Sequence, residues 1–566
     1  MENVPSFDLV SSPWLPVQRT DGSMATLSLR EVFAQAAGLR RLVGDVPTQE
    51  FALIRLLLAI LHDAAEGPED IDGWTELWQS ADSLDVVQPY LERHRGRFDL
   101  LHPEKPFFQV AGLHVGSGDI ASLNKIVADV PNGDPYFSMR MPGVDRLDFA
   151  EAARWVVHTQ AFDISGIKSG VEGDPRTKGG KVYPLGVAWT GHLGGVMVEG
   201  HTLRETLLLN LVAADAESVS FKEEDCPAWR REQCGPGASD PLALASRPYG
   251  PRDLYTWQSR RLRLYHDDEG VYGVVLGYGD PLGPQNMQML EPMTGWRRSE
   301  AQEKKHNLPQ VYMPREHDPA RAAWRGMAGL IPDMPGKGGA RSGDPAALLR
   351  PRVLEWMAQL TNEDILPQGY LVRTRIVGAK YGTQQSIIDE LVDDSVAMPV
   401  AVLRSQDPRY GQAAVMAVGD ADKAVKALAD LAGDLARALG AEADKHRDAA
   451  RDRGYGELDS PYRLWLRNLG ESGDPDRERA EWQRRTYRII RGLGRELLDH
   501  TTAAAWEGRV VDKQWFDDTS ADRWFRIRLS NALPRAFEES ESPGGPPGEP
   551  GSEPRSSDTE SAEGDE

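Results

Sequence analysis

Residues 6–23 of this chain read SFDLVSSPWLPVQRTDGS, and they are followed by LSLREVF at residues 27–33 and FALIRLLLAILH at residues 51–62. The first stretch has two short extended runs around Thr20-Asp21-Gly22, and because glycine tolerates positive φ this pattern predicts a β-hairpin. Ser28 with Glu31 three residues later forms a capping-box signature, which predicts a helix start. Apolar residues recur at helical spacing from residue 51 to residue 61, so a buried helix is expected there.

The length and composition of the chain bound its class. Its 566 residues suffice for two or more domains, and 40% of them are apolar, as in ordinary globular proteins. We expect no signal peptide, because the start is acidic, and no membrane span, because the longest aliphatic run, residues 56–61, is far too short. Cys226 and Cys234 lack zinc-site spacing and indicate no oxidising compartment. A cytoplasmic protein is therefore predicted.

The charge is distributed unevenly. The formal net charge is −22, and residues 538–566 contain ten acidic residues and one arginine, so this tail carries −9. A chain with this balance does not coat nucleic acid by bulk charge, and any contact must come from local basic clusters. The tail has almost no apolar residues to bury and is predicted to be disordered.

Patterning divides the rest of the chain into two parts. Residues 1–395 mix helical stripes with short strands and Gly/Pro-rich loops, including a predicted hairpin over residues 261–276 and a predicted strand at 371–377. Residues 396–537 carry long apolar stripes at helical spacing, which predict a helical bundle. The expected fold class is α+β, with a mixed amino-terminal domain, a carboxy-terminal bundle and the acidic tail at 538–566.

The amino-terminal sequence quoted above resembles that of the CasA family, the large subunit of the type I-E CRISPR Cascade surveillance complex. The resemblance implies a mixed domain followed by a four-helix bundle. It implies a non-catalytic protein without cofactor or metal that recognises the short target-adjacent motif (PAM) from the minor groove and starts unwinding for R-loop formation. The implied partners are target double-stranded DNA, the CRISPR RNA handle, the Cascade backbone and small subunits and a recruited helicase-nuclease, with no membrane.

The resemblance also implies roles for three loops. Phe137, Ser138, Met139 and Arg140 match a loop that contacts the guide-RNA handle and helps to sense the motif. The segment Ser165–Gly170 matches a glycine loop that reads the motif, with Ser165, Gly166 and Ile167 as alternatives for the backbone contact. Glycines let a backbone approach a groove closely, and Lys168 is expected to supply charge. An insertion, Val171 to Gly195, separates this loop from the matching helix.

The third loop is Gly378–Ile388, where the resemblance assigns Gln384 as a wedge that enters the duplex, with Thr383 beside it. The simpler interpretation is a turn in which Thr383 or Ser386 caps a following helix. A groove-reading lysine of the family lies nine residues before a tryptophan. Counting back from Trp296 gives Met287, so the role is expected to fall on its neighbours Asn286 or Gln288, whose amides can donate to minor-groove acceptors.

Four arginines form a candidate stripe that binds phosphates or a partner, Arg484, Arg488, Arg491 and Arg495. Their spacing of 4, 3 and 4 places them on one helix face. The alternative is a solvated face paired with Glu478, Glu481 and Glu496.

Two other function classes stay open. The dipeptides His62-Asp63 and His317-Asp318 would suit an HD-type metal-dependent phosphohydrolase, although each also fits a helix end or a turn. The third class is a helical scaffold protein without nucleic-acid contact.

Overall fold

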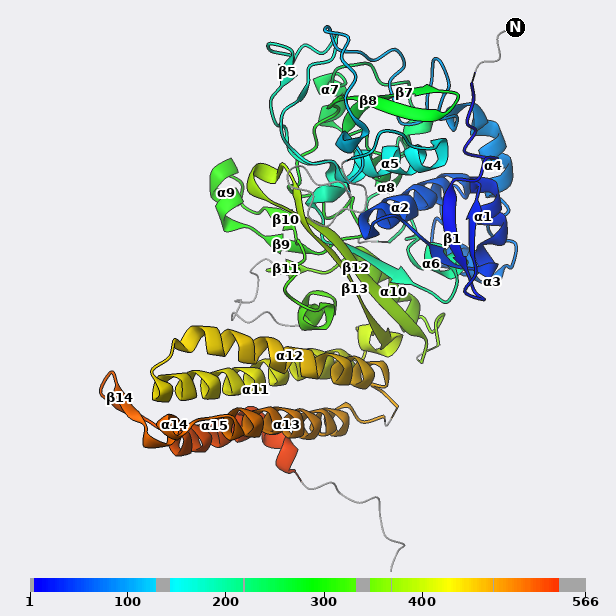
Figure 1. Ribbon diagram of the computed structural model, residues 1–566. Coiled ribbons are helices and arrows are strands. Elements are labelled where there is room, and N and C mark those ends of the chain that lie inside the picture. The colour runs from blue at the N-terminus through cyan, green and yellow to red at the C-terminus, as the bar shows by residue number, and fades with distance from the viewer. Residues whose placement is uncertain are drawn as a thin grey trace, which may run out of the picture.

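The computed structural model describes residues 5–128, 143–216, 219–331, 347–367, 369–471 and 473–538. Helices and strands alternate up to residue 403, and long helices dominate thereafter (Figure 1). The expected mixture of helices and strands is confirmed. No helix in these ranges combines the length and apolarity that crossing a membrane requires.

The first elements follow the sequence prediction. Strands β1 (Leu15–Arg19) and β2 (Met24–Leu27) form the hairpin, and β3 (Leu39–Leu42) completes a small antiparallel sheet. Both bonds of the capping box between Ser28 and Glu31 are present at the start of α1 (Leu29–Gln35). Helix α2 (Pro47–Ala64) is buried along nearly its whole length, as expected from its apolar residues at helical spacing.

The remaining helices of the mixed part are α3 (Ile71–Gln79), α4 (Val87–His94), α5 (Phe149–Phe162), α6 (Leu203–Leu209), α7 (Pro241–Ala245), α8 (Pro251–Tyr255), α9 (Glu300–His306) and α10 (Arg352–Asn362). Its remaining strands are β4 (Lys168–Ser169), β5 (Lys181–Val182), β6 (Gly195–Glu199), β7 (Arg260–Asp267), β8 (Gly270–Tyr278), β9 (Trp296–Arg298), β10 (Tyr312–Pro314), β11 (Leu348–Leu349), β12 (Leu371–Tyr381) and β13 (Ile388–Pro399). The predicted hairpin at 261–276 is confirmed as β7–β8.

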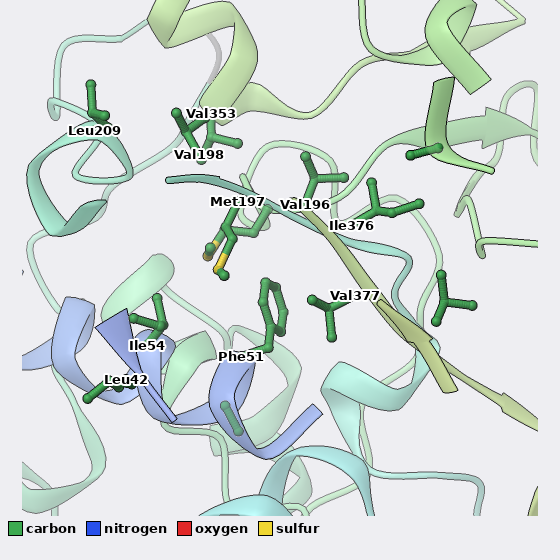
Figure 2. Close-up of a cluster of buried hydrophobic side chains, with 14 of the residues drawn as sticks. Leu42, Phe51, Ile54, Val196, Met197, Val198, Leu209, Val353, Ile376 and Val377 are labelled. Atoms are coloured by element: carbon green, nitrogen blue, oxygen red, sulfur yellow. The ribbon is translucent and has the colours of Figure 1, made fainter. Parts of the chain in front are cut away.

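A three-stranded sheet at the centre of the mixed part positions the candidate site. β12 pairs with β13 along almost its whole length and with β6 on its other edge. Figure 2 shows Phe51 and Ile54 of α2 packed beneath Val196, Met197 and Val198 of β6, with Ile376 and Val377 of β12 alongside. Burying these side chains stabilises the sheet by about 1.5–3 kcal/mol each. The β12–β13 hairpin is therefore anchored at its base by the main core.

The carboxy-terminal helices are α11 (Arg409–Leu439), α12 (Ala443–Arg467), α13 (Pro475–Asp499), α14 (Ala503–Glu507) and α15 (Asp518–Ala532), with a short hairpin of β14 (Arg509–Val511) and β15 (Gln514–Phe516). Helix α11 packs against α12, α13 and α15 (Figure 1). Trp482 of α13 is fully buried and donates from its indole to the Ala417 carbonyl of α11 at 2.9 Å. Strand β13 runs to Pro399, so it crosses the boundary expected at residue 395.

Candidate nucleic-acid interface

The tip of the β12–β13 hairpin carries the two predicted wedge residues. A tight turn at Thr383–Gln385 joins the strands, and Gln384 and Gln385 both have a φ of 56°. Left-handed backbone is uncommon for glutamine, so the surrounding ladder must hold this turn in place. The side chains of residues 383–385 are exposed. The expectation that a helix follows this turn is wrong, because residues from Ile388 onward pair with β12 instead.

The predicted glycine loop lies directly against this hairpin tip. The Ser165 amide donates to the Gln385 carbonyl at 2.8 Å, and the Tyr278 hydroxyl donates to the Gly166 carbonyl at 2.6 Å. Gly166 has a φ of +113°, and a Cβ there would point toward Ser386. The structure therefore brings Ser165 and Gly166 next to the turn that holds Thr383 and Gln384. Ile167 follows and is 56% exposed.

Lys168 does not supply an exposed charge, which corrects the sequence expectation. Its side chain is buried, and its ammonium lies 2.7 Å from a carboxylate oxygen of Asp163. Arg260 binds the same carboxylate and stacks on the Tyr278 ring, 4.8 Å from its centroid. Burial favours the neutral form of Asp163, but Lys168 and Arg260 hold its pKa below the usual range. The lysine therefore fixes the loop from inside.

Residues 286–288 form a turn against β10 rather than part of the glycine loop. The Asn286 amide group is already engaged, because its Oδ1 accepts from the Tyr312 amide at 2.8 Å and its Nδ2 donates to the Gln310 carbonyl at 3.3 Å. Met287 is half-buried and packs against a cluster that contains Trp189. The Gln288 side chain makes no hydrogen bond to any residue that the structure describes, and its Oε1 is buried.

These three residues contact neither the glycine loop nor the hairpin tip through a hydrogen bond or ion pair within the described ranges. The connection is indirect, because the Trp189 segment packs on Met287 while the neighbouring Ala188 amide donates to the Asp163 carbonyl. Phe137, Ser138, Met139 and Arg140 lie outside the described residues.

Sequence reasoning missed the residues that fix the glycine loop. Asp163, Arg260 and Tyr278 hold its base, and the Tyr381 hydroxyl donates to the Phe162 carbonyl at 2.7 Å. The one local signal was Asp163, five positions before Lys168, because an acidic and a basic side chain this close in sequence can form an ion pair. The partners from β7, β8 and β12 are distant in sequence and gave no signal.

The family model of CRISPR-associated protein Cse1 matches residues 8–493 of the chain. The chain belongs to the Cse1 family. The resemblance inferred from the amino terminus is thus confirmed, since Cse1 is the CasA family.

Members of the Cse1 family match over most of the chain. The crystal structure of Thermobifida fusca Cse1 has 55% sequence identity and a TM-score of 0.88, covering 94% of this chain and 99% of that chain. The CasA/Cse1 protein of Thermus thermophilus is 27% identical over 482 residues, which are 83% of this chain and 84% of that protein. A chain in the structure of a CRISPR RNA-guided surveillance complex shares the fold at 19% identity, with a TM-score of 0.56, covering 94% of this chain and 99% of that chain.

The arginine stripe of this Cse1 chain lies on α13. Arg488 and Arg495 are exposed, whereas Arg484 and Arg491 are half-buried. Arg491 stacks on Tyr487, and Arg484 donates to a backbone carbonyl. None of the four forms an ion pair with another residue in the described part of the chain. Of the acidic residues expected as their partners, Glu481 pairs with Arg477 and Glu496 pairs with Arg453.

The histidines of both His-Asp dipeptides are held in the protein interior. Asp63 is buried and binds Arg230 and Arg252, while burial lowers the pKa of His62 to about 3. His317 bonds the Gly195 carbonyl, and burial lowers its pKa to about 4. Across the described ranges, no group of three or more His, Cys, Asp and Glu side chains is arranged to hold a metal ion.

Proposed function

We propose that this chain is the non-catalytic large subunit of a Cascade-type antiviral complex, with the glycine loop and the hairpin tip facing the target duplex. Membership in the Cse1 family supports the complex. The observation that carries the proposed surface is the hydrogen bond from the Ser165 amide to the Gln385 carbonyl. It joins a backbone that can approach a groove to a turn whose side chains are exposed.

The glycine loop and Gln288 would read the motif. Gly166 leaves room for close approach of backbone to the minor groove, and Ile167 is exposed beside it. Of the two amides expected to take the groove-reading role, Asn286 and Gln288, we assign it to Gln288, which would donate from Nε2, because the Asn286 amide is used internally and Gln288 Oε1 is buried. The minor groove displays a degenerate code, so acceptance of several related motifs is expected.

Thr383 and Gln384 would start strand separation. Long antiparallel pairing with β13 and packing on the core make their hairpin stiff enough to insert between base pairs. Unstacking costs a few kcal/mol per step. Guide pairing then nearly balances the DNA pairing that it replaces, so the rate of R-loop formation depends on this first opening.

The remaining contacts follow from the same proposal. Phe137–Arg140 would contact the CRISPR RNA handle, and the α13 stripe would bind displaced single-stranded DNA or a neighbouring subunit. The chain would also help to recruit the helicase-nuclease. Its exposed arginines on α13 form no ion pair in the described ranges, so their charges are available to an external partner.

The test is purification of the tagged chain from cells that express a complete CRISPR system. We expect CRISPR RNA and the sister subunits to copurify, and the complex to bind a duplex that carries the motif. An untagged chain is the control for carry-over. A chain that purifies alone would contradict the proposal, and metal-dependent phosphodiester turnover by the pure chain would favour a phosphohydrolase instead.

A further inference from the structure

A cavity of about 200 Å³ lies on the other side of the central sheet from α2. It is bounded by Val196 of β6 and Ile376 of β12, and by the 3₁₀ helix Ala323–Gly329. Its ionisable lining residues are two arginines, Arg315 and Arg321, together with Glu316, His317 and Asp318. The proposed motif-reading surface does not include this cavity.

Arg315 is held in the cavity wall by its backbone and by close packing. Its amide donates to the Gly295 carbonyl at 2.8 Å. Its guanidinium lies against Gly329, where a Cβ would overlap the Nη1 atom, and near Gly326. A side chain at Gly329 would therefore displace the guanidinium from the cavity.

The charge of Arg315 has no counter-ion in the described part of the chain. Other arginines of the mixed part show the usual solution, since Arg55 pairs with Glu291 and Arg261 pairs with Asp280. Arg315 is half-buried, and even partial removal of a cation from water is unfavourable without a partner. Burial lowers the pKa of Arg315, and the neighbouring Arg321 lowers it further. Arg315 and Arg321 are thus two neighbouring cations, neither of which forms an ion pair in the described part of the chain.

The other ionisable groups around the cavity form no ion pair with Arg315 in the described part of the chain. Glu316 and Asp318 are exposed, and the Asp318 carboxylate accepts from the Ala320 amide at 3.0 Å. Neither forms an ion pair with Arg315 or Arg321 among the described residues. His317 is used by the Gly195 carbonyl, and burial lowers its pKa to about 4, so it is neutral near pH 7.

We propose that the Arg315–Arg321 cavity binds one phosphate group of a nucleic-acid backbone, an assignment that rests on the proposed function. Two guanidiniums suit a phosphate because their N–H groups match its oxygens in pairs. The volume is below the roughly 300–1,000 Å³ of pockets that enclose whole small molecules, so a single compact anion fits better than a nucleotide. Ile376 of the cavity wall lies on β12, the strand that leads to the hairpin tip. At about 3.3 Å per residue, the strand from Ile376 to its end at Tyr381 spans about 17 Å.

The first experiment uses the full chain without nucleic acid and inorganic phosphate as the probe. Unfolding midpoints are compared in phosphate and in chloride at matched ionic strength for the wild type, Arg315→Gln, Arg321→Gln and Arg297→Gln. Arg297 is exposed on β9 outside the cavity and controls for the loss of one charge. We expect phosphate to raise the midpoint of the wild type and Arg297→Gln more than that of the two cavity variants. Equal shifts in all four proteins would overturn the site.

The second experiment places Arg321→Gln and Arg297→Gln in the assembled complex and measures the salt dependence of target binding. The cavity variant should lower the slope by roughly one unit relative to the control. An unchanged slope would overturn the nucleic-acid assignment. Arg321 is exposed, so this variant stays informative if Arg315→Gln fails to fold.

Two acidic residues outside the described ranges, Asp333 and Asp344, are the rival counter-ions within the chain. If phosphate raises the unfolding midpoint only in the double variant Asp333→Asn, Asp344→Asn, an internal carboxylate pairs with the arginines in the wild type. That result would overturn the assignment of an external ligand. Because the first experiment contains no nucleic acid, failure of the proposed motif function would not affect its outcome, and the two failures are distinguishable.

Discussion

Basic side chains beside the glycine loop and those along α13 are held in opposite ways. Lys168 and Arg260 are buried, and both bind Asp163. Arg488 and Arg495 are exposed and have no ion pair within the described ranges. A basic residue in a candidate binding segment can therefore offer its charge to a partner only where its side chain is exposed and is not already paired inside the protein.

The sharpest test of this difference replaces Arg260 with glutamine. Breaking a buried ion pair by removing one partner costs about 3–5 kcal/mol, and Arg260→Gln should lie near the lower end of this range because Lys168 still pairs with the buried Asp163. The matched variant Arg488→Gln should change the free energy of unfolding by no more than about 0.5 kcal/mol. Denaturant unfolding of both variants measures the contrast.

The same pair has an expected pH dependence. The folded-state pKa of Asp163 is lowered, because Lys168 and Arg260 outweigh its burial. Its contribution to stability is therefore complete above the ordinary aspartate pKa and is lost as the pH falls through the lowered folded value. The difference between wild type and Arg260→Gln should shrink in acid. A difference that grows as the pH falls, or a cost no larger than that of Arg488→Gln, would show that Asp163 does not depend on Arg260.

The hairpin tip belongs with the α13 stripe, since its side chains are also exposed. Replacing both Thr383 and Gln384 with alanine should slow R-loop formation on intact duplex by about a hundredfold, because the wedge offsets a few kcal/mol of unstacking. Motif binding should weaken much less. Stopped-flow measurement of strand opening checks the rate.

A target that is already melted beside the motif serves as the control for this variant. Most of the defect should vanish on that target, because no stacking remains to be broken. An equal defect on both targets would mean that the turn has only a structural role.

Within the turn at residues 286–288, the side-chain amide of Asn286 is hydrogen-bonded and that of Gln288 is not. Gln288→Ala should change the relative affinities for different motifs by about 1–3 kcal/mol, which is the value of one good base contact. Asn286→Ala should affect all motifs equally, because its amide binds Tyr312 and Gln310. Binding assays over a panel of motifs would show this, and a selective effect of Asn286→Ala alone would reverse the assignment.

The smallest expected effect concerns the stripe itself. Arg488→Gln with Arg495→Gln should leave stability unchanged and reduce the salt slope of DNA binding by roughly one unit for each phosphate contact removed. Titration of the assembled complex at several salt concentrations measures the slope. The same double replacement with lysine keeps the charge and should retain most of the slope, whereas an unchanged slope in both variants would leave the stripe as a solvated face.

The sequence alone determined features that depend on neighbouring residues. The turn at Thr20–Gly22, the Ser28–Glu31 capping box, helix α2 and the β7–β8 hairpin each follow from patterns within a few residues. Hydrophobic periodicity and turn chemistry act over this range, so a single sequence is sufficient to predict them. The amino-terminal sequence also identified the family.

Which polar groups remain available to a partner depends on contacts between distant segments. Ser165 meets Gln385, and Arg260 joins Lys168 on the buried Asp163, through contacts between segments far apart in the chain. The chain after Gln384 forms a strand because β12 offers it a complete hydrogen-bonding edge, which outweighs the local capping signal. Local patterns do not contain these partners, and burial of a charge depends on every segment packed around it. The fold was therefore largely readable from the sequence, whereas the free charge of Arg315 was not.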